Sequence, residues 1–288
     1  MNLKARNNYK LITAKYFVTK FIIRLLNWST VFGLFLFGDV LFGQSNRALF
    51  DSTWYGFNSG TFTNGRYPVS MRMADIDNDG DMDVVIAKNT WSDGFTLLKN
   101  EGDGFFQQPE HYLSPEPTED VATADFDQDG WIDVAVANYG LFGFSTTISL
   151  FLNQGSGGFG TAQNYSVGEG PAGLAAADFN SDGSPDLAVA NFGYLGQGDS
   201  ISVLLNDGNG GFQPSINFFA SSSPYKVVAK DVDGDTLLDL IVANENQKLN
   251  ILFNSGGNDF SNRTEYNVLS QWASDFYPNV VVADMDND

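Results

Sequence analysis

The chain contains no cysteine and one histidine, and its 15 lysines and arginines stand against 35 aspartates and glutamates, a formal net charge of −20 over 288 residues. The missing cysteines exclude disulfide bridges, cysteine-ligated zinc and a cysteine nucleophile. The acidic excess argues against nucleic-acid binding, because a phosphate backbone would be repelled. With 43% hydrophobic and 14% aromatic residues, the chain has enough apolar side chains for a packed core.

The chain also lacks an uninterrupted apolar run of the roughly 20 residues that a membrane span requires. Residues 1–43 carry six basic residues and one acidic residue, and include an apolar stretch at residues 31–38. This pattern predicts a signal peptide cleaved near Gly43 or Ser45, with an uncleaved N-terminal anchor as the alternative. Either interpretation places residues 44–288 outside the cytoplasm, so we expect a secreted or cell-surface protein.

An internal repeat of about 50 residues organises the remainder of the chain. Its most regular part is an acidic nine-residue segment of the pattern D-x-D-x-D-G-x-x-D. The five copies, numbered here as loops one to five, begin at Asp75, Asp125, Asp178, Asp231 and Asp284, at intervals of 50, 53, 53 and 53 residues. The fifth copy stops at its fifth position, where the sequence ends.

Apolar segments flank each loop. A proline stands six to eight residues before it, an apolar run such as Val84–Ala87 follows it, and a second run ends in asparagine (Asn100, Asn153, Asn206 or Asn254). A phenylalanine lies six residues after each asparagine. Short runs rich in Val, Ile, Leu and Phe between Gly, Asn and Asp predict strands, and continuous apolar runs predict burial on both strand faces. Three clear strands and a weaker fourth per repeat predict an all-β protein, a β-propeller of four-stranded blades with about four and a half repeats in residues 44–288.

The loops have the composition of a cation site. Three acids at alternate positions, a glycine and a closing acid four residues later would repel one another without a counter-ion. A hard divalent cation with six to eight oxygen ligands removes this conflict, and many flexible oxygens favour Ca²⁺ over Mg²⁺. The absence of His and Cys from the loops disfavours softer metals. The glycine at position six permits a positive φ.

The predicted ligands are the side chains at positions one, three, five and nine, with position nine bidentate, and the backbone carbonyl at position seven by analogy with the EF-hand loop. In chain order they are Asp75, Asp77, Asp79, Asp81 and Asp83; Asp125, Asp127, Asp129, Trp131 and Asp133; Asp178, Asn180, Asp182, Ser184 and Asp186; Asp231, Asp233, Asp235, Leu237 and Asp239; and Asp284, Asp286 and Asp288.

We therefore expect about four complete Ca²⁺ sites and an incomplete fifth. Asn180 lowers the charge of loop three but keeps an oxygen ligand. Loop four carries Gly234 at position four and Thr236 where glycine is expected. Loop four is therefore predicted to bind more weakly than loops one and two.

These repeats resemble the FG-GAP / VCBS family, which includes the calcium-loop propellers of integrin α-subunit heads. The likeness lies in the Asp loops, the strands that follow them, and the glycine-rich turns such as Asn206–Phe212, over roughly residues 50–288. It implies a propeller, usually of seven blades, with calcium in a hairpin loop of most blades. Residues 50–67 look like the tail of a preceding blade, and we expect the sequence to be a fragment of a longer protein.

Three functions fit this resemblance. The first is an extracellular module for adhesion or ligand recognition that binds a protein or glycan and has no catalytic residues. Aromatic residues outside the repeat pattern either supply its platform or simply cover the blade faces: Trp91, Tyr139, Phe142, Phe144, Phe192 and Tyr194. The second is a polysaccharide lyase or hydrolase, and the third is a structural scaffold of a larger surface protein.

The enzyme hypothesis finds little support in the sequence. The one histidine, His111, lies in what the sequence suggests is a proline-rich loop, and no Ser/His/Asp set is apparent. Glu116, Glu119 and Asp120 are the remaining candidates for a general acid and base. A glycosidase requires two carboxyl groups on either side of a sugar, an arrangement that the sequence does not reveal.

Overall fold

The computed structural model describes residues 68–89, 94–102, 105–245, 247–268, 280 and 282. The predicted N-terminal segment 1–43, residues 50–67, Trp91 and the fifth loop with Asp284, Asp286 and Asp288 lie outside the described residues. Within the described part, no helix is long and apolar enough to cross a membrane.

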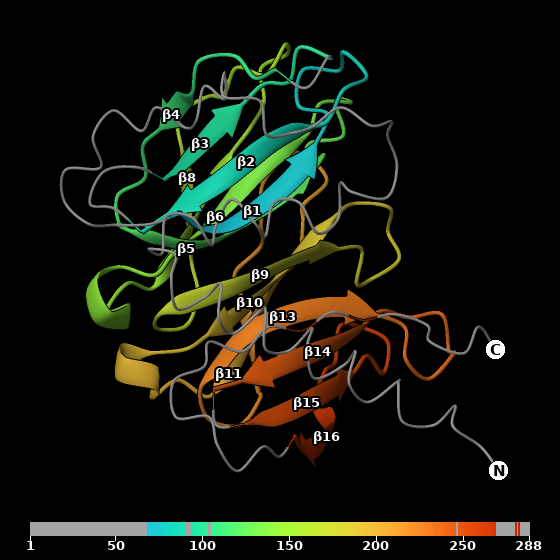
Figure 1. Cartoon of the computed structure of the whole chain (residues 1–288). Helices are drawn as coiled ribbons and strands as arrows, with labels where there is room; N and C mark the ends of the chain where they lie inside the picture. The colour runs from blue at the N-terminus through green and yellow to red at the C-terminus, as the bar shows by residue number, and fades with distance from the viewer. Residues whose placement is uncertain are drawn as a thin grey trace, which may run out of the picture. The chain divides into compact units, whose positions relative to one another are not determined.

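The described chain forms four consecutive four-stranded antiparallel sheets, each from one repeat (Figure 1). In each sheet the strands pair in chain order, as in a propeller blade. Blade one contains β1 (Pro68–Ala74), β2 (Asp83–Lys88), β3 (Phe95–Leu98) and β4 (Glu110–Tyr112); blade two contains β5 (Thr118–Ala124), β6 (Asp133–Asn138), β7 (Thr147–Phe151) and β8 (Gln163–Ser166). Blade three contains β9 (Pro171–Ala177), β10 (Asp186–Asn191), β11 (Ser200–Leu204) and β12 (Ile216–Phe219); blade four contains β13 (Pro224–Lys230), β14 (Asp239–Asn244), β15 (Lys248–Phe253) and β16 (Asn262–Asn267).

The predicted strands are confirmed. A proline is the first residue of β1, β9 and β13, where its missing N–H costs no ladder bond, and Pro117 directly precedes β5. The run after each loop forms the second strand, which is buried throughout in β6, β10 and β14. The phenylalanines Phe106, Phe159 and Phe212 form isolated bridges to Asn100, Asn153 and Asn206, and the weaker fourth strand follows.

First strands of neighbouring blades contact one another, β1 with β5, β5 with β9 and β9 with β13. Gly173 in β9 makes one of these contacts possible, because a Cβ there would stand 2.4 Å from the carbonyl oxygen of Tyr225 in β13. Apolar clusters fill the space between successive blades, for example Val85 and Phe95 with Val134 and Phe151.

The residue at position two inserts into these clusters in loops one to three, as Ile76, Phe126 and Phe179. In loop four the residue at this position, Val232, is 39% exposed. Phe126 and Phe179 are fully buried and meet the phenylalanine of the next blade's turn, with ring centroids 5.4 Å apart for Phe126 and Phe212 and 5.7 Å apart for Phe179 and Phe260. Truncating a buried phenylalanine typically costs about 3–5 kcal/mol. Loops one to three are therefore fastened to the cores between blades.

Candidate metal centre

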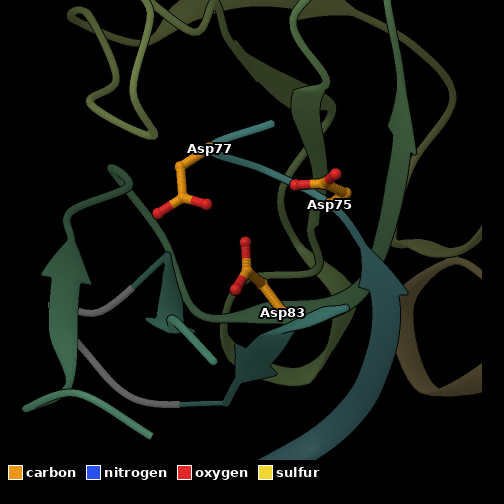
Figure 2. Close-up of side chains that lie close together, drawn as sticks. All are labelled: Asp75, Asp77 and Asp83. Atoms are coloured by element: carbon orange, nitrogen blue, oxygen red, sulfur yellow. The ribbon is translucent and has the colours of Figure 1, made fainter. Parts of the chain in front are cut away.

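Each loop connects the first and second strands of its blade. In loop one, Asp75 follows β1, Asp77 lies in the turn and Asp83 begins β2. Their carboxylates point into one space (Figure 2). One oxygen from each residue lies within 4.8 Å of the others, and the same is true of Asp125, Asp127 and Asp133 and of Asp231, Asp233 and Asp239. Positions one, three and nine of loops one, two and four are thus brought together as predicted.

The backbone arranges these carboxylates. Position one accepts two backbone N–H groups of its own loop: Asp79 N donates to Asp75 Oδ1 over 3.1 Å and Gly80 N to Asp75 Oδ2 over 2.9 Å. The glycine at position six has φ of +94°, +91° and +91° in loops one to three, which confirms the expected left-handed turn. In loop four Thr236 takes φ of +77° there, and position four is also left-handed in the four loops that the structure describes.

Position nine is the most buried of the acidic positions, with 0% exposure in all four loops. Asp133 accepts the N–H of Phe126 through Oδ2 (2.7 Å) and the N–H of Asn153 through Oδ1 (2.7 Å). Burial raises the pKa of Asp133 to about 7 and that of Asp186 to about 6, against the backbone hydrogen bonds that lower them. Burial also raises the pKa of Asp83 and Asp239.

Position three carries a sign of a missing partner. Oδ1 of Asp77 is buried and has no hydrogen-bond partner among the described residues. Burial and the neighbouring carboxylates Asp83 and Asp79 raise the pKa of Asp77. Buried polar atoms normally have a hydrogen-bond partner. The Asp77 oxygen lacks one, and it lies at a position where a metal ligand was predicted. An oxygen-seeking cation fits both the orphaned atom and the donor set.

The remaining predicted ligands lie apart from the three close groups. The position-five carboxylates of Asp79, Asp129, Asp182 and Asp235 accept, through Oδ1, the N–H of Asp81, Trp131, Ser184 and Leu237 at position seven. These bonds direct the position-five carboxylates toward the backbone of their own loop.

Loop three differs from the others at Asn180. Its amide nitrogen donates to Asp182 Oδ2 over 2.8 Å, and its Oδ1 accepts the N–H of Asp182 over 2.9 Å. The backbone N–H of Ser184 and the Asn180 amide lower the pKa of Asp182. Asp178 accepts the N–H groups of Asp182 and Gly183, as position one does elsewhere. N–H groups of loop three therefore stabilise part of the negative charge of its own carboxylates.

Sequence reasoning missed a role for the asparagine that ends the third strand. Asn153 Nδ2 donates to the carbonyl of Ile132 in its own loop (3.1 Å) and to the carbonyl of Ile76 in the preceding blade's loop (2.8 Å). Asn206 makes the same pair of bonds to Pro185 and Phe126, and Asn254 to Leu238 and Phe179. Its recurrence at one place in every repeat was the available signal.

Two of the three acid–base candidates are held in other contacts, and the third, Glu116, is partly exposed. Asp120 in β5 is fully buried and pairs with Lys226 Nζ at 3.0 Å and Arg72 Nη2 at 3.5 Å. Glu119 is 9% exposed and accepts from Tyr225 Oη (2.5 Å) and Asn89 Nδ2 (2.9 Å). The prediction that His111 lies in a proline-rich loop is wrong. His111 lies in β4, because this strand ends before the prolines that follow it, and its Nδ1 is 2.8 Å from Thr96 Oγ1.

Several solved structures share parts of this architecture. An Agrocybe aegerita lectin described as recognising non-reducing terminal N-acetylglucosamine is 19% identical, with a TM-score of 0.47 over 67% of this chain and 50% of its own. BBS1N in complex with ARL6DN is 13% identical, with a TM-score of 0.44 over 65% of this chain and 54% of its own. The Photorhabdus luminescens Tc holotoxin pore is 19% identical, with a TM-score of 0.38 over 60% of this chain and 8% of its own.

The chain thus spans about half the length of the first two of these proteins. No curated protein matches its sequence. The FG-GAP-like repeat matches four times, at residues 75–136, 125–189, 178–242 and 231–288, each match beginning at the first aspartate of a loop. Together these matches cover most of the chain, so the chain belongs to the FG-GAP-like repeat family.

Proposed function

We propose that the chain is an extracellular, calcium-binding recognition module without catalysis of its own. The observation that carries the proposal is the convergence of carboxylates from positions one, three and nine in three copies of one loop, with an orphaned buried oxygen at Asp77. Hard oxygen donors in a flexible loop suit Ca²⁺ better than Mg²⁺, which demands a tighter octahedron and keeps its waters.

The bound cation would be held by these aspartates, with position five and the position-seven carbonyl completing the shell. It would supply positive charge that cancels their repulsion and fixes the loop between its strands. In loops one to three the chain's own residues do the rest: position two anchors the loop in the core, and the asparagine of the next blade holds its backbone. The proposed role of calcium is therefore structural.

Recognition is assigned to the opposite ends of blades two and three, where the second and third strands are connected. The short 3-10 turns η2 (Leu141–Gly143) and η3 (Tyr194–Gly196) contact each other, and the rings of Phe144 and Tyr194 stack with centroids 4.3 Å apart. Phe142 and Leu195 are 63% and 61% exposed. Both have positive φ, +56° and +50°, a conformation that costs about 1–2 kcal/mol in L-residues.

Strained, exposed apolar residues favour a binding surface over simple coverage of the blade. Of the other aromatic candidates, Phe192 is buried against Tyr225 and Tyr139, which supports a packing role. A protein or a glycan is the proposed ligand. An array of glycans and matrix proteins, probed with the native chain and with a Phe142→Ser/Phe144→Ser variant, tests this assignment. Binding lost in the variant supports it, whereas equal binding by both would place recognition elsewhere.

The alternatives differ in what they require of the acids. A polysaccharide-acting enzyme needs an accessible pair of carboxyl groups, and the contacts of Glu119 and Asp120 favour structural roles for both. A scaffold of a larger surface protein would bind calcium and nothing on the array.

Thermal unfolding of the chain with millimolar calcium, with chelator and with magnesium tests the calcium assignment. A cation that binds only the folded state raises the melting temperature. We expect a rise that is much larger with calcium than with magnesium. A cooperative transition at the same temperature in all three conditions would leave the loops as solvated acidic turns.

A further inference from the structure

Hydrogen bonds connect the acidic loops of neighbouring blades to one another. Asn78, at position four of loop one, donates from Nδ2 to the carbonyl of Gly130, at position six of loop two, over 3.0 Å. Gln128, at position four of loop two, donates from Nε2 to the carbonyl of Gly183 in loop three over 2.9 Å and lies 3.1 Å from Ser184 Oγ. In both pairs of loops, the side chain at position four therefore donates to the backbone carbonyl at position six of the next loop.

The accepting carbonyl belongs to a peptide group that also serves a proposed ligand. The N–H of this peptide group is that of Trp131, which donates to Asp129 Oδ1 over 2.9 Å. In loop three the corresponding N–H of Ser184 donates to Asp182 Oδ1 over 2.8 Å. An uninterrupted path of hydrogen bonds thus runs from position four of one loop to position five of the next.

At its starting end the path is tied to the preceding site. Asn78 stands between Asp77 and Asp79 and has φ of +55°, and Gln128 stands between Asp127 and Asp129 with φ of +58°. A non-glycine residue holds this conformation only where the surrounding loop enforces it. Ordering of the loop around a cation would enforce it, and would fix the direction of the position-four side chain.

A second path runs alongside. Asn153 is not itself a proposed ligand, but its N–H donates to the position-nine carboxylate of loop two (2.7 Å) while its amide holds the Ile76 carbonyl of loop one (2.8 Å). Ile76 separates the two proposed ligands Asp75 and Asp77. Asn206 and Asn254 repeat this arrangement at the next two pairs of loops.

We propose that the cation sites of loops one, two and three bind cooperatively, each occupied loop raising the affinity of its neighbour through these two paths. Loops three and four are joined more weakly, since no side-chain hydrogen bond of Ser181, at position four of loop three, reaches loop four within the described residues. The inference rests on the proposed calcium function. Coupling of this kind is reciprocal, so loop three acts on loop two as loop two acts on loop three.

Trp131 makes loop two observable by itself. It occupies position seven of that loop, and no other described loop contains a tryptophan. Terbium, a trivalent ion of calcium's oxygen preference, emits when a nearby indole transfers excitation to it. Titration of the full chain with terbium under indole excitation therefore reports occupancy of loop two, and loss of the signal in Trp131→Phe verifies its source. Displacement by calcium then gives the calcium affinity.

The test disables loop one with Asp75→Asn/Asp83→Asn and follows loop two. Cooperative sites predict that terbium and calcium bind loop two about fivefold or more weakly in this variant. Asn78→Ala removes the first path and leaves the Asn153 path in place, so in that background the same disabling change should weaken loop two by a clearly smaller factor than in the native chain. Ser181→Ala removes a position-four side chain that lacks the bond to the next loop, and should leave the fivefold effect intact.

If loop two binds terbium and calcium equally well in the native chain and in the loop-one variant, the proposed cooperativity is wrong, whereas the proposed calcium binding is unaffected. Absence of sensitised emission at every terbium concentration, together with a melting temperature indifferent to calcium, overturns the proposed function and the coupling with it. Because Asp83 is buried, circular dichroism must show that the loop-one variant is folded. Should it be unfolded, Asp178→Asn/Asp182→Asn in loop three supplies the reciprocal measurement at Trp131. Weaker binding by loop two then supports the coupling, and unchanged binding overturns it.

Discussion

At some positions of the acidic loops, backbone conformation constrains the residue type as strongly as side-chain chemistry does. Position six of the loop is left-handed in all four described copies, and glycine occupies it in three. Thr236, the exception, is β-branched, and a β-branched residue at positive φ is a true outlier. At position six, loop four therefore stores strain that loops one to three avoid there with glycine, whereas at position four the glycine belongs to loop four, as Gly234.

Replacing Thr236 by glycine should stabilise the calcium-free protein by about 1 kcal/mol, because the left-handed penalty outweighs the entropy that glycine adds to the unfolded chain. Urea unfolding in the presence of chelator measures the change. Gly183→Ala is the matched control, since the space around that Cβ is open and only φ resists the substitution. It should destabilise by a similar amount, and a gain in stability there would contradict the explanation.

At the scale of strands and loops, the asparagine that closes each third strand joins two blades. Asn153 is 2% exposed and satisfies two carbonyls that belong to different acidic loops. Loss of its amide would leave two acceptors without a donor where water has little access.

Asn153→Ala is therefore expected to cost about 2–4 kcal/mol of folding free energy, from two buried acceptors left unpaired. Chemical denaturation measures it. Asn209→Ala provides the control: Asn209 is exposed, its side chain bonds only within its own turn, and its loss should change stability by less than about 0.5 kcal/mol. Equal effects for the two variants would show that Asn153 is not a clamp.

The strands of this fold were largely predictable from the sequence, whereas the contacts between blades were not. Strand positions follow from apolar runs such as Leu187–Ala190 and from the prolines that precede each loop, because period and punctuation are local properties. The convergence of positions one, three and nine also followed from spacing. The contact of Asn153 with Ile76 spans 77 residues, and nothing local indicates it. The exposure of Phe142 beside a buried Phe192 likewise depends on how two blades meet.

At the scale of the whole molecule, a buried polar cluster joins all four blades at their first strands. Asp120 of blade two accepts from Ser70 of blade one and from Leu174 N of blade three, and pairs with Lys226 of blade four. Burial acts to raise the pKa of Asp120, but Lys226 and Arg72, together with the hydrogen bonds from Ser70 and Leu174, outweigh it and hold the pKa below its usual value. Beside it, burial raises the pKa of Glu119, which the hydrogen bonds from Tyr225 and Asn89 oppose.

The two carboxyl groups have opposite effects on stability. Asp120, with a lowered pKa, stabilises the fold above its unfolded value of 3.8 and loses that contribution as the pH falls through its folded pKa. Glu119, with a raised pKa, favours the folded state fully below 4.5 and loses that contribution as the pH rises through its folded pKa.

Glu119→Gln should therefore reduce the loss of stability that accompanies a rise in pH above 4.5, because the amide retains the size of the side chain and carries no charge into the interior. Melting temperatures of the native chain and the variant, measured across roughly pH 4 to 8 with saturating calcium, give the difference. A constant difference at every pH would show that Glu119 does not titrate over this range in the folded protein.

The clamp between blades also sets an order of assembly. A polypeptide leaves the ribosome from its N-terminus, so the carbonyl of Ile76 is synthesised 77 residues before the Asn153 amide that binds it. The carbonyl of Phe126 is likewise synthesised 80 residues before the amide of Asn206. Each blade can pair its own strands early, yet its acidic turn is completed by its successor. During synthesis from the N-terminus, the hydrogen bonds that hold the acidic turns of blades one to three can therefore form only after the following repeat has been made.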